Sequence, residues 1–273
     1  IVLPDADIDR ASSAAVWGAF CNSGQVCASI ERVYVHESIA EPFTRQVVEK
    51  TKKLRQGSGL SADVDIGSMT AEMQIAKVEQ QVADAKKRGA EVLTGGERNR
   101  QQDGRFYLPT VLTHVDHTFP VVQEETFGPV LPIMTYRTED EAVRLANDSP
   151  YGLNAYVWGK NLKKAGKVAS RLVAGTVNVN ERGFSFAVPQ TPWGGPKESG
   201  LGRTHGTLGL LEMVQVRHVY VNRKASKNFW WYPYSAEKLR LMKMLTEALF
   251  GKGMPRLAAM FRFFRLKRKV KTM

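Results

Sequence analysis

Residues 20–29 join a small-residue helical pattern to an apolar strand pattern. This junction predicts that a helix ends and a strand begins within a few residues of each other. The sequence there, Phe-Cys-Asn-Ser-Gly-Gln-Val-Cys-Ala-Ser, places Cys27 just past a Gly-Gln pair. A thiol at a helix-to-strand junction lies near backbone N–H groups, and a stabilised thiolate there can act as a nucleophile. The alternative is a structural role, because a free cysteine usually packs as a small buried hydrophobic residue.

Helical and strand patterns follow one another on both sides of this junction. Helical spacing of apolar residues predicts helices over residues 10–20, 39–54, 71–88, 140–146 and 162–172, the first capped by Asp7 or Asp9. Apolar runs predict strands over residues 31–36, 91–94, 106–115 and 130–136, a turn into a strand over 151–158, and a buried strand over 175–180. Pro109 indicates an edge position or an irregularity in its strand.

Three sequence blocks carry a family resemblance in the same order along the chain. A Phe-x-Asn-x-Gly-Gln-x-Cys pattern ends at Cys27, and Glu-Glu-Thr-Phe-Gly-Pro-Val occupies residues 124–130. Pro-Trp-Gly-Gly-Pro-Lys-Glu-Ser-Gly-Leu-Gly-Arg occupies residues 192–203. Together they resemble the NAD(P)-dependent aldehyde dehydrogenase superfamily, with Trp193 in place of the family's usual Phe, and the resemblance covers residues 1–222.

The resemblance implies an α/β fold in which helices flank an open, mostly parallel sheet. Residues 1–213 would form the family's catalytic domain, incomplete at its N-terminus. Residues 214–222 would form an oligomerisation strand that pairs across a subunit interface. A homodimer or homotetramer is therefore expected for the full-length protein.

The same resemblance assigns roles to individual residues. Cys27 matches the family's catalytic nucleophile. Glu125 would bind the nicotinamide ribose, since one carboxylate can accept both vicinal hydroxyls, and Phe127 would line the nicotinamide ring. Gln74 and Lys77 match positions near the adenosine ribose of NAD or NADP. The alternative for Gln74 and Lys77 is that both are solvated helix residues.

The substrate mouth and the surroundings of the thiol are less constrained. Phe184 and Phe186 fall where the family has a variable loop at the substrate entrance, and packing is an equal alternative for both. Cys21 matches a variable position, so it is expected to pack. The chain's two cysteines show no metal-ligand or disulfide spacing, which predicts no metal site and favours a reducing, cytoplasmic setting.

Family chemistry predicts that Cys27 attacks an aldehyde to give a thiohemiacetal, then a thioester that water hydrolyses to the acid. The family's general-base Glu, a second oxyanion donor and most of the dinucleotide site would lie ahead of Ile1. This chain by itself is therefore expected to be inactive and to bind NAD(P) poorly. The alternative is a CoA-acylating relative, in which a thiol takes the acyl group and no such base is needed.

The excess positive charge lies entirely after residue 222. Residues 223–273 hold 14 Lys and Arg against two Glu, whereas the first 222 residues hold 25 basic and 25 acidic side chains. Aromatic residues over 228–234 and helical patterns after Ser235 and Pro255 predict a packed aromatic segment and amphipathic helices. Basic residues interleaved with Phe and Leu suit an interfacial helix on anionic lipid, and hence peripheral membrane attachment.

Two other interpretations of this basic tail stay open. It could be a solvated tail, or a helix that packs between subunits. No stretch is apolar enough to span a membrane, and nothing resembles a nucleic-acid-binding module, so no nucleic-acid partner is expected.

Overall fold

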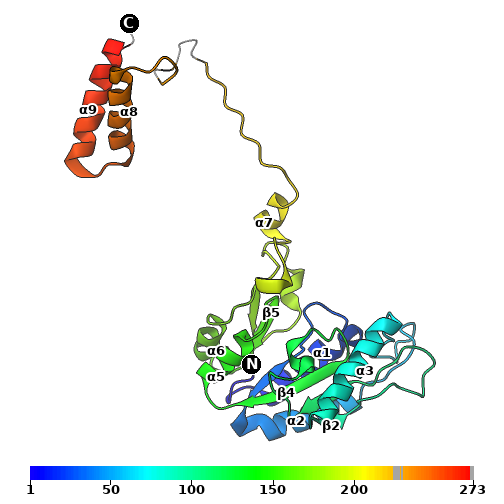
Figure 1. Cartoon of the computed structure of the whole chain (residues 1–273). Coiled ribbons are helices and arrows are strands. Elements are labelled where there is room, and N and C mark those ends of the chain that lie inside the picture. Colours follow the sequence, from blue (N-terminus) through cyan, green and yellow to red (C-terminus); the bar gives the residue numbers. More distant parts are fainter. Residues whose placement is uncertain (224–227, 229, 271–273) are drawn as a thin grey trace. The chain divides into compact units, whose positions relative to one another are not determined.

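The computed structural model describes residues 1–223, 228 and 230–270, with side chains described to residue 267. The chain divides into two compact units, Ile1–Val216 and Arg217–Met273. Each unit is described by itself below. Figure 1 shows the elements of both units in chain order.

The first unit is built on parallel strands. A four-stranded sheet has the order β1-β4-β3-β2, in which β1 and β3 both pair parallel to β4, and β2 pairs antiparallel at the edge. A second, two-stranded parallel sheet contains β5 and β6. The strands are β1 (Val33–His36), β2 (Glu91–Thr94), β3 (Thr110–Thr113), β4 (Val130–Tyr136), β5 (Asn154–Val157) and β6 (Thr176–Val179).

The two sheets are linked by the first residues of the chain. Val2 forms parallel bridges to Val35 in β1 and to Trp158, the residue after β5. Its N–H donates to the Tyr34 carbonyl at 2.8 Å, and the Leu3 N–H donates to the Trp158 carbonyl at 2.8 Å. The predicted α/β fold with an open, mostly parallel sheet is therefore confirmed.

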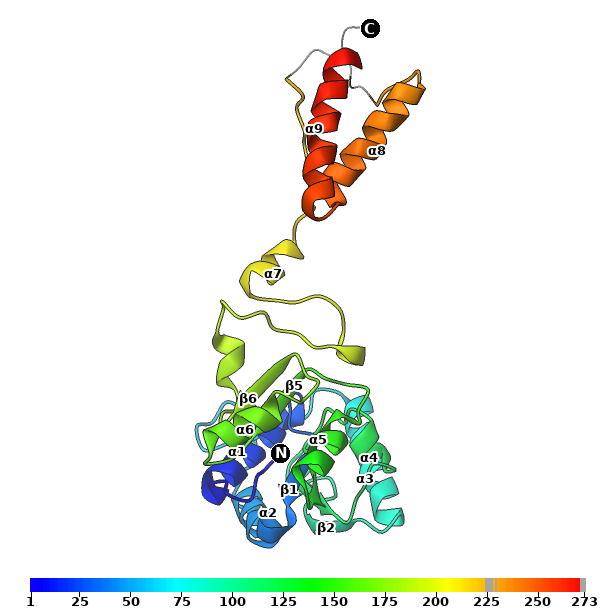
Figure 2. The same ribbon diagram turned by 90° about the vertical axis from the view of Figure 1, so that its left-hand side faces the viewer.

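Helices cover both faces of the larger sheet, as Figure 2 shows for α1 and α2 on one side and α3 and α5 on the other. The helices of this unit are α1 (Ile8–Phe20), α2 (Glu37–Lys52), α3 (Glu72–Lys87), α4 (Pro120–Gln123), α5 (Glu139–Asn147), α6 (Leu162–Ala169) and α7 (Gly206–Leu211), with 3-10 turns η1 (Cys21–Gly24), η2 (Phe184–Ala187) and η3 (Lys197–Ser199). The predicted cap of the first helix is Asp7, whose side chain accepts from the Arg10 N–H.

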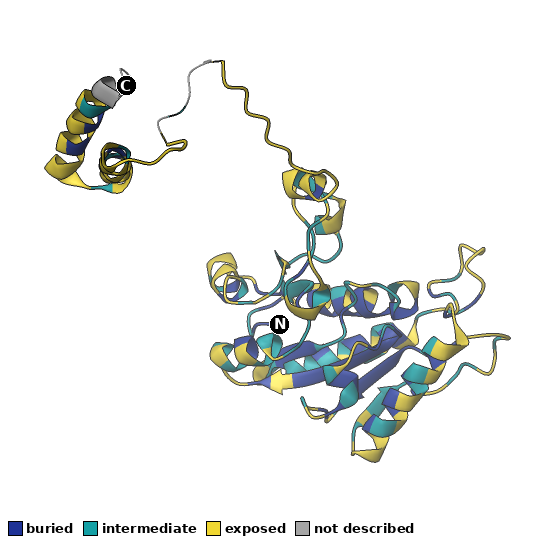
Figure 3. Ribbon diagram, turned by 45° about the horizontal axis from the view of Figure 1, so that its top comes forward, coloured by how far each residue is buried: buried dark blue, intermediate teal, exposed yellow. Residues whose placement is uncertain are grey.

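Alternating side chains of the strands supply two cores. On β4, Leu131 and Ile133 face the cluster that includes α1 and α2, whereas Met134 and Tyr136 face the cluster that includes α3 and α5. A strand buried on both faces reads as a continuous apolar run, which is why residues 130–136 were recognisable in the sequence. Figure 3 shows the buried residues concentrated along this sheet.

Some predicted elements differ from the structure. The strand predicted over residues 106–115 is limited to Thr110–Thr113, because it begins only after Pro109, which has no N–H to donate. The strand predicted as buried over residues 175–180 is only partly buried, because β6 is one of two strands in a small sheet. Residues 215–223 form neither helix nor strand here. Strand pairing of residues 214–222 across a subunit interface therefore stays a prediction.

The second unit is a helical hairpin of α8 (Ala236–Phe250) and α9 (Gly253–Val270). Ser235 caps α8 by accepting from the Lys238 N–H at 3.2 Å, as predicted. The buried apolar side chains of the hairpin are Leu241, Ala248, Ala259 and Phe263. The aromatic side chains predicted to pack over residues 228–234 are exposed at positions 230, 231, 232 and 234, and position 229 lies outside the described residues. Within the described part of the chain, no helix is long and apolar enough to cross a membrane.

Truncation of Leu131 tests the central strand. Leu131 is fully buried in β4, so Leu131→Ala is expected to lower the free energy of unfolding by about 2–5 kcal/mol through lost burial and a cavity. Urea unfolding followed by circular dichroism measures this loss. Thr135→Ala changes the one exposed position of β4, so it is the matched control and should change stability by less than about 1 kcal/mol. Equal losses in the two variants would contradict the difference in burial between Leu131 and Thr135.

Candidate active site

A left-handed turn carries the chain from α1 toward Cys27. Asn22, Ser23 and Gly24 have φ values of 52°, 57° and 72°, a region that asparagine and glycine tolerate better than other residues. The buried Ser23 hydroxyl donates to the Gly67 carbonyl at 2.7 Å, and the Thr70 N–H donates to Gln25 Oε1 at 2.9 Å. These bonds fix the turn against the loop that precedes α3.

Cys27 itself is exposed, whereas Cys21 is partly buried. The exposure excludes the buried structural role that was the alternative for Cys27. The neighbouring Ala28 carbonyl accepts from Arg182 Nη2 at 2.9 Å and from the Tyr156 hydroxyl at 3.2 Å. The backbone after the thiol is therefore held by two donors from later parts of the chain. Within the described residues, the Cys27 N–H makes no hydrogen bond.

Arg182 reaches Ala28 through a stack of rings. Its guanidinium lies 5.1 Å from the centre of the Trp17 ring and 5.2 Å from that of Tyr156, distances typical of cation–π contacts. Burial raises the pKa of Tyr156 to about 12, so its hydroxyl stays protonated and available as a donor at neutral pH. Sequence reasoning missed both Arg182 and Tyr156, because their contacts bridge distant segments.

Cys27 and Glu125 line the same cavity, which has a volume of about 330 Å³. Its walls come mainly from segments that precede β1, β4, β5 and β6, and β1 and β4 are parallel neighbours. Parallel neighbouring strands have their amino ends on the same side of the sheet, so the segments that precede them meet there. This is how residues so distant in sequence come together. The Glu125 carboxylate is exposed and has no partner among the described residues, so it can accept a diol.

Phe127 lies on the loop that precedes β4, and Gln74 reaches this loop from the first turn of α3. Phe127 is partly buried, has a φ of 46°, and is not among the described residues that line the cavity. Gln74 Nε2 donates to the Thr126 carbonyl at 2.7 Å and to the Phe127 carbonyl at 3.2 Å. The Gln74 amide nitrogen is therefore engaged by this loop, and its oxygen stays available to a ligand. Lys77 is partly buried and its Nζ has no partner within the described residues.

Glu31 is an acidic residue of this site that sequence reasoning did not single out. Its carboxylate accepts from the Thr126 and Phe127 N–H groups, each at 2.9 Å. Burial raises the pKa of the Glu31 carboxyl, against the lowering effect of these two hydrogen bonds, and the nearby Glu125 charge also raises it. The only available signal was a glutamate within the strand pattern of residues 31–36.

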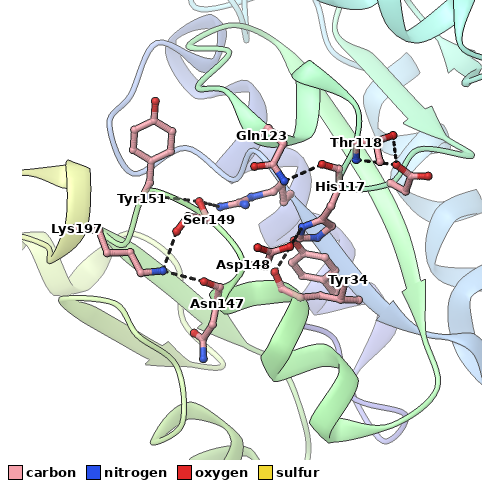
Figure 4. Close-up of polar contacts among 12 residues, drawn as sticks. Tyr34, His117, Thr118, Gln123, Asn147, Asp148, Ser149, Tyr151 and Lys197 are labelled. Carbon is pink, nitrogen blue, oxygen red and sulfur yellow. Dashed lines mark hydrogen bonds and ion pairs between the residues drawn. The ribbon is translucent and has the colours of Figure 1, made fainter.

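A polar network joins Arg32 and Tyr34, which line the cavity, to residues of later segments (Figure 4). Arg32 Nη2 donates to the Ser149 hydroxyl at 2.8 Å, and the Tyr34 hydroxyl and His117 Nε2 share a hydrogen bond of 2.9 Å. His117 Nδ1 lies 3.0 Å from an Asp148 carboxylate oxygen. Burial raises the pKa of Tyr34 to about 12, so the network is built on a neutral phenol.

The third sequence motif forms a backbone support beside this network. Lys197 Nζ donates to the Asn147 and Ser149 carbonyls at 2.8 Å each. A side chain at Gly195 would place its Cβ 2.7 Å from the Gly152 carbonyl oxygen, so this glycine marks a close approach of two backbones.

The predicted substrate-mouth aromatics lie apart from the cavity. Phe184 and Phe186 are both exposed, and among the described residues neither lines the cavity. Phe186 packs edge-on against Trp193, with ring centres 5.1 Å apart, and lies 5.2 Å from the His205 ring. Their assignment to a substrate wall stays a prediction.

Comparisons with known proteins extend over most of the chain. The sequence profile described as the aldehyde dehydrogenase family matches residues 1–219. A betaine aldehyde dehydrogenase of Bacillus subtilis is 40% identical over 234 residues, which are 85% of this chain and 47% of that protein. A 4,4'-diapolycopene aldehyde oxidase of Methylomonas sp is 40% identical over 252 residues, covering 92% of this chain and 46% of that protein.

A solved structure agrees with these sequence matches. The crystal structure of a betaine aldehyde dehydrogenase from Staphylococcus aureus in complex with NAD+ has a TM-score of 0.80 and 37% sequence identity. The match covers 85% of this chain and 46% of that one. This chain therefore spans about half the length of the relatives it matches.

Gly24 tests the packing of the thiol turn. A Cβ at Gly24 would lie 2.1 Å from the Gly128 carbonyl oxygen, and the residue has a φ of +72°. Gly24→Ala is therefore expected to cost about 3 kcal/mol or more of unfolding free energy, measured by urea titration. Gly59→Ala, where a Cβ meets nothing within 4 Å, should change it by less than about 1 kcal/mol. A tolerated alanine at position 24 would refute the close contact.

Proposed function

Because the chain belongs to the aldehyde dehydrogenase family, we propose that it is the catalytic-cysteine part of an NAD(P)-dependent enzyme that oxidises an aldehyde to a carboxylic acid. The observation that carries this proposal is the shared cavity of the exposed Cys27 and the unpartnered Glu125 carboxylate. The proposal makes Cys27 the nucleophile and Glu125 the acceptor of the ribose hydroxyls, with Phe127 beside the nicotinamide.

The chemistry begins at the thiol. The Cys27 thiolate attacks the aldehyde carbon, and the carbonyl oxygen becomes an oxyanion that the free Cys27 N–H can stabilise. When bound, NAD(P)+ accepts the hydride that leaves this carbon. The resulting thioester on Cys27 is hydrolysed by water, which releases the acid and restores the thiol. Gln74 and Lys77 are proposed to contribute to the adenosine end of the site.

The acceptor of the acyl group separates two versions of this proposal. Hydrolysis needs a general base, which family resemblance places ahead of Ile1. The second version transfers the acyl group to the thiol of CoA and needs no such base. We favour hydrolysis, because a betaine aldehyde dehydrogenase and an aldehyde oxidase are among the relatives of this chain.

The substrate is proposed to be an apolar aldehyde. The two relatives are equally similar to this chain, yet one is named for betaine aldehyde and the other for 4,4'-diapolycopene aldehyde. The second alignment favours the apolar choice because it includes the tail. Only 222 residues precede the tail, so an alignment of 252 residues includes at least 30 residues of the tail.

The tail supports a peripheral role at an anionic lipid surface. Its hairpin buries few side chains and exposes large apolar ones, with Phe250, Met254 and Phe261 exposed at 79%, 84% and 83%. Basic side chains lie among them along both helices, and Glu237 and Glu247 are the acidic residues of the hairpin. Apolar side chains beside Lys and Arg are the combination that binds the boundary between headgroups and acyl chains.

Replacement of the nucleophile tests the proposed reaction. The purified chain by itself is expected to reduce no NAD(P)+ with aldehydes, because most of the cofactor site and the base are proposed to lie outside it. A polypeptide that also carries the segment that relatives have ahead of the matched region should be active. In that polypeptide Cys27→Ser should lower kcat by about 10³-fold or more, since the covalent step is lost.

Controls for this assay come from the chain itself. Cys21→Ser removes the other thiol and should leave kcat within about threefold. Products are measured with and without CoA, and an acyl-CoA product would replace the hydrolytic version with the acylating one. Aldehyde oxidation by the unextended chain at rates comparable to its relatives would contradict the expected inactivity.

Removal of the tail tests the lipid proposal. The full chain should co-sediment with vesicles that contain anionic phospholipid, and added salt should weaken binding, since each basic side chain near the surface contributes about 1 kcal/mol. Phe261→Ala with Leu257→Ala keeps the charge and should still weaken binding by removing inserted apolar area. Co-sedimentation that persists without residues 223–273 would exclude the tail as the anchor.

A further inference from the structure

Glu31 connects the two segments on which the proposed reaction depends. It follows Cys27 by four positions in the sequence. Its two carboxylate oxygens accept from consecutive backbone N–H groups, Oε2 from Thr126 and Oε1 from Phe127, at 2.9 Å each. The segment of the thiol and the segment of Glu125 are thus joined through one side chain.

The loop that Glu31 holds needs such support. Phe127 has a φ of 46°, a left-handed conformation that costs a non-glycine residue about 1 kcal/mol or more. Two successive N–H groups that converge on one anion form a concave anion site, and Glu31 fills it from the side of β1. Gln74 donates to the carbonyls of the same two residues. The N–H and carbonyl groups of Thr126 and Phe127 are therefore all satisfied by side chains.

The electrostatic surroundings show that Glu31 is held at some cost. The nearby charge of Glu125 disfavours ionisation of this carboxyl, and that of Arg32 favours it. Burial is the largest influence and raises the pKa of Glu31. An apolar side chain at position 31 would avoid both the burial of a charge and the repulsion from Glu125. Packing alone therefore does not explain a glutamate at this position.

We infer that Glu31 is a positioning residue, which holds the loop of Glu125 and Phe127 at a fixed place relative to the Cys27 thiol. This inference rests on the proposed function, in which that loop carries the nicotinamide end of the cofactor. Hydride transfer requires the reacting carbon and the nicotinamide to be held in close, aligned contact. A side chain that ties both segments together serves that requirement without touching the reacting atoms.

The test uses the full chain with Cys21→Ser, so that Cys27 is the single thiol. Amide hydrogen exchange at Thr126 and Phe127, followed by NMR, should accelerate about tenfold or more in Glu31→Gln, because charge-assisted hydrogen bonds are lost. The second readout uses the longer polypeptide that also carries the segment relatives have ahead of the matched region. There the alkylation of Cys27 by iodoacetamide is followed by mass spectrometry of the Cys27 peptide during a titration with NAD+ into the millimolar range. The NAD+ concentration for half-protection should rise about tenfold in Glu31→Gln.

Two further variants control the comparison. Glu31→Asp keeps the charge on a shorter side chain and should give values between those of the parent and Glu31→Gln, also where Glu31→Gln proves poorly folded. Glu41→Gln changes an exposed glutamate of α2 and should match the parent in both readouts.

The outcomes separate the inference from the proposal beneath it. Protection of the parent by NAD+ together with faster exchange and weaker protection in Glu31→Gln supports the positioning role. Unchanged exchange in Glu31→Gln, or equal protection of parent and variant, overturns it while leaving the proposed function intact. Absence of protection in the parent overturns the cofactor site that this chain is proposed to contribute, and the positioning role with it.

Discussion

The contact between Gly24 and the Gly128 carbonyl is the constraint on which the rest of the site depends. A Cβ at position 24 would lie 2.1 Å from that oxygen, so only glycine allows the thiol turn to rest on the loop of Glu125 and Phe127. The distance between the turn before Cys27 and this loop is thereby set by direct contact between two backbone segments. Backbone contacts of this kind vary less than contacts between side-chain ends, which suits a site that must align two reactants.

Polar side chains then secure what the glycine contact allows. Glu31 satisfies two N–H groups of the loop, Gln74 satisfies two of its carbonyls, and Ser23 ties the thiol turn to the Gly67 carbonyl. Peptide groups that were buried and left unpaired would each cost about 1–3 kcal/mol. The site is therefore stabilised by the same hydrogen bonds that orient it.

The two units of the chain differ in their charge balance and in how much apolar surface they bury. The first unit balances its charges and buries apolar side chains on both faces of a sheet. The hairpin of α8 and α9 carries nearly all its charge with one sign and leaves most of its large apolar side chains exposed. A hairpin of this composition gains little from burial in water, and an anionic lipid surface would satisfy both features together.

The sequence by itself determined the family and most elements, and it singled out Cys27 as the candidate nucleophile, because these depend on short-range signals. Apolar periodicity located α1, α2, α3 and β4 to within a few residues, and the motif around Cys27 required only local spacing. The tertiary structure decided which distant residues meet. Parallel pairing of β1 with β4 brings Cys27 and Glu125 together beside the amino ends of these strands. The same pairing lets Glu31 accept hydrogen bonds from Thr126 and Phe127. No local pattern encodes that pairing, because parallel neighbours are joined through long connections, and their register is settled only when both faces of the sheet are packed.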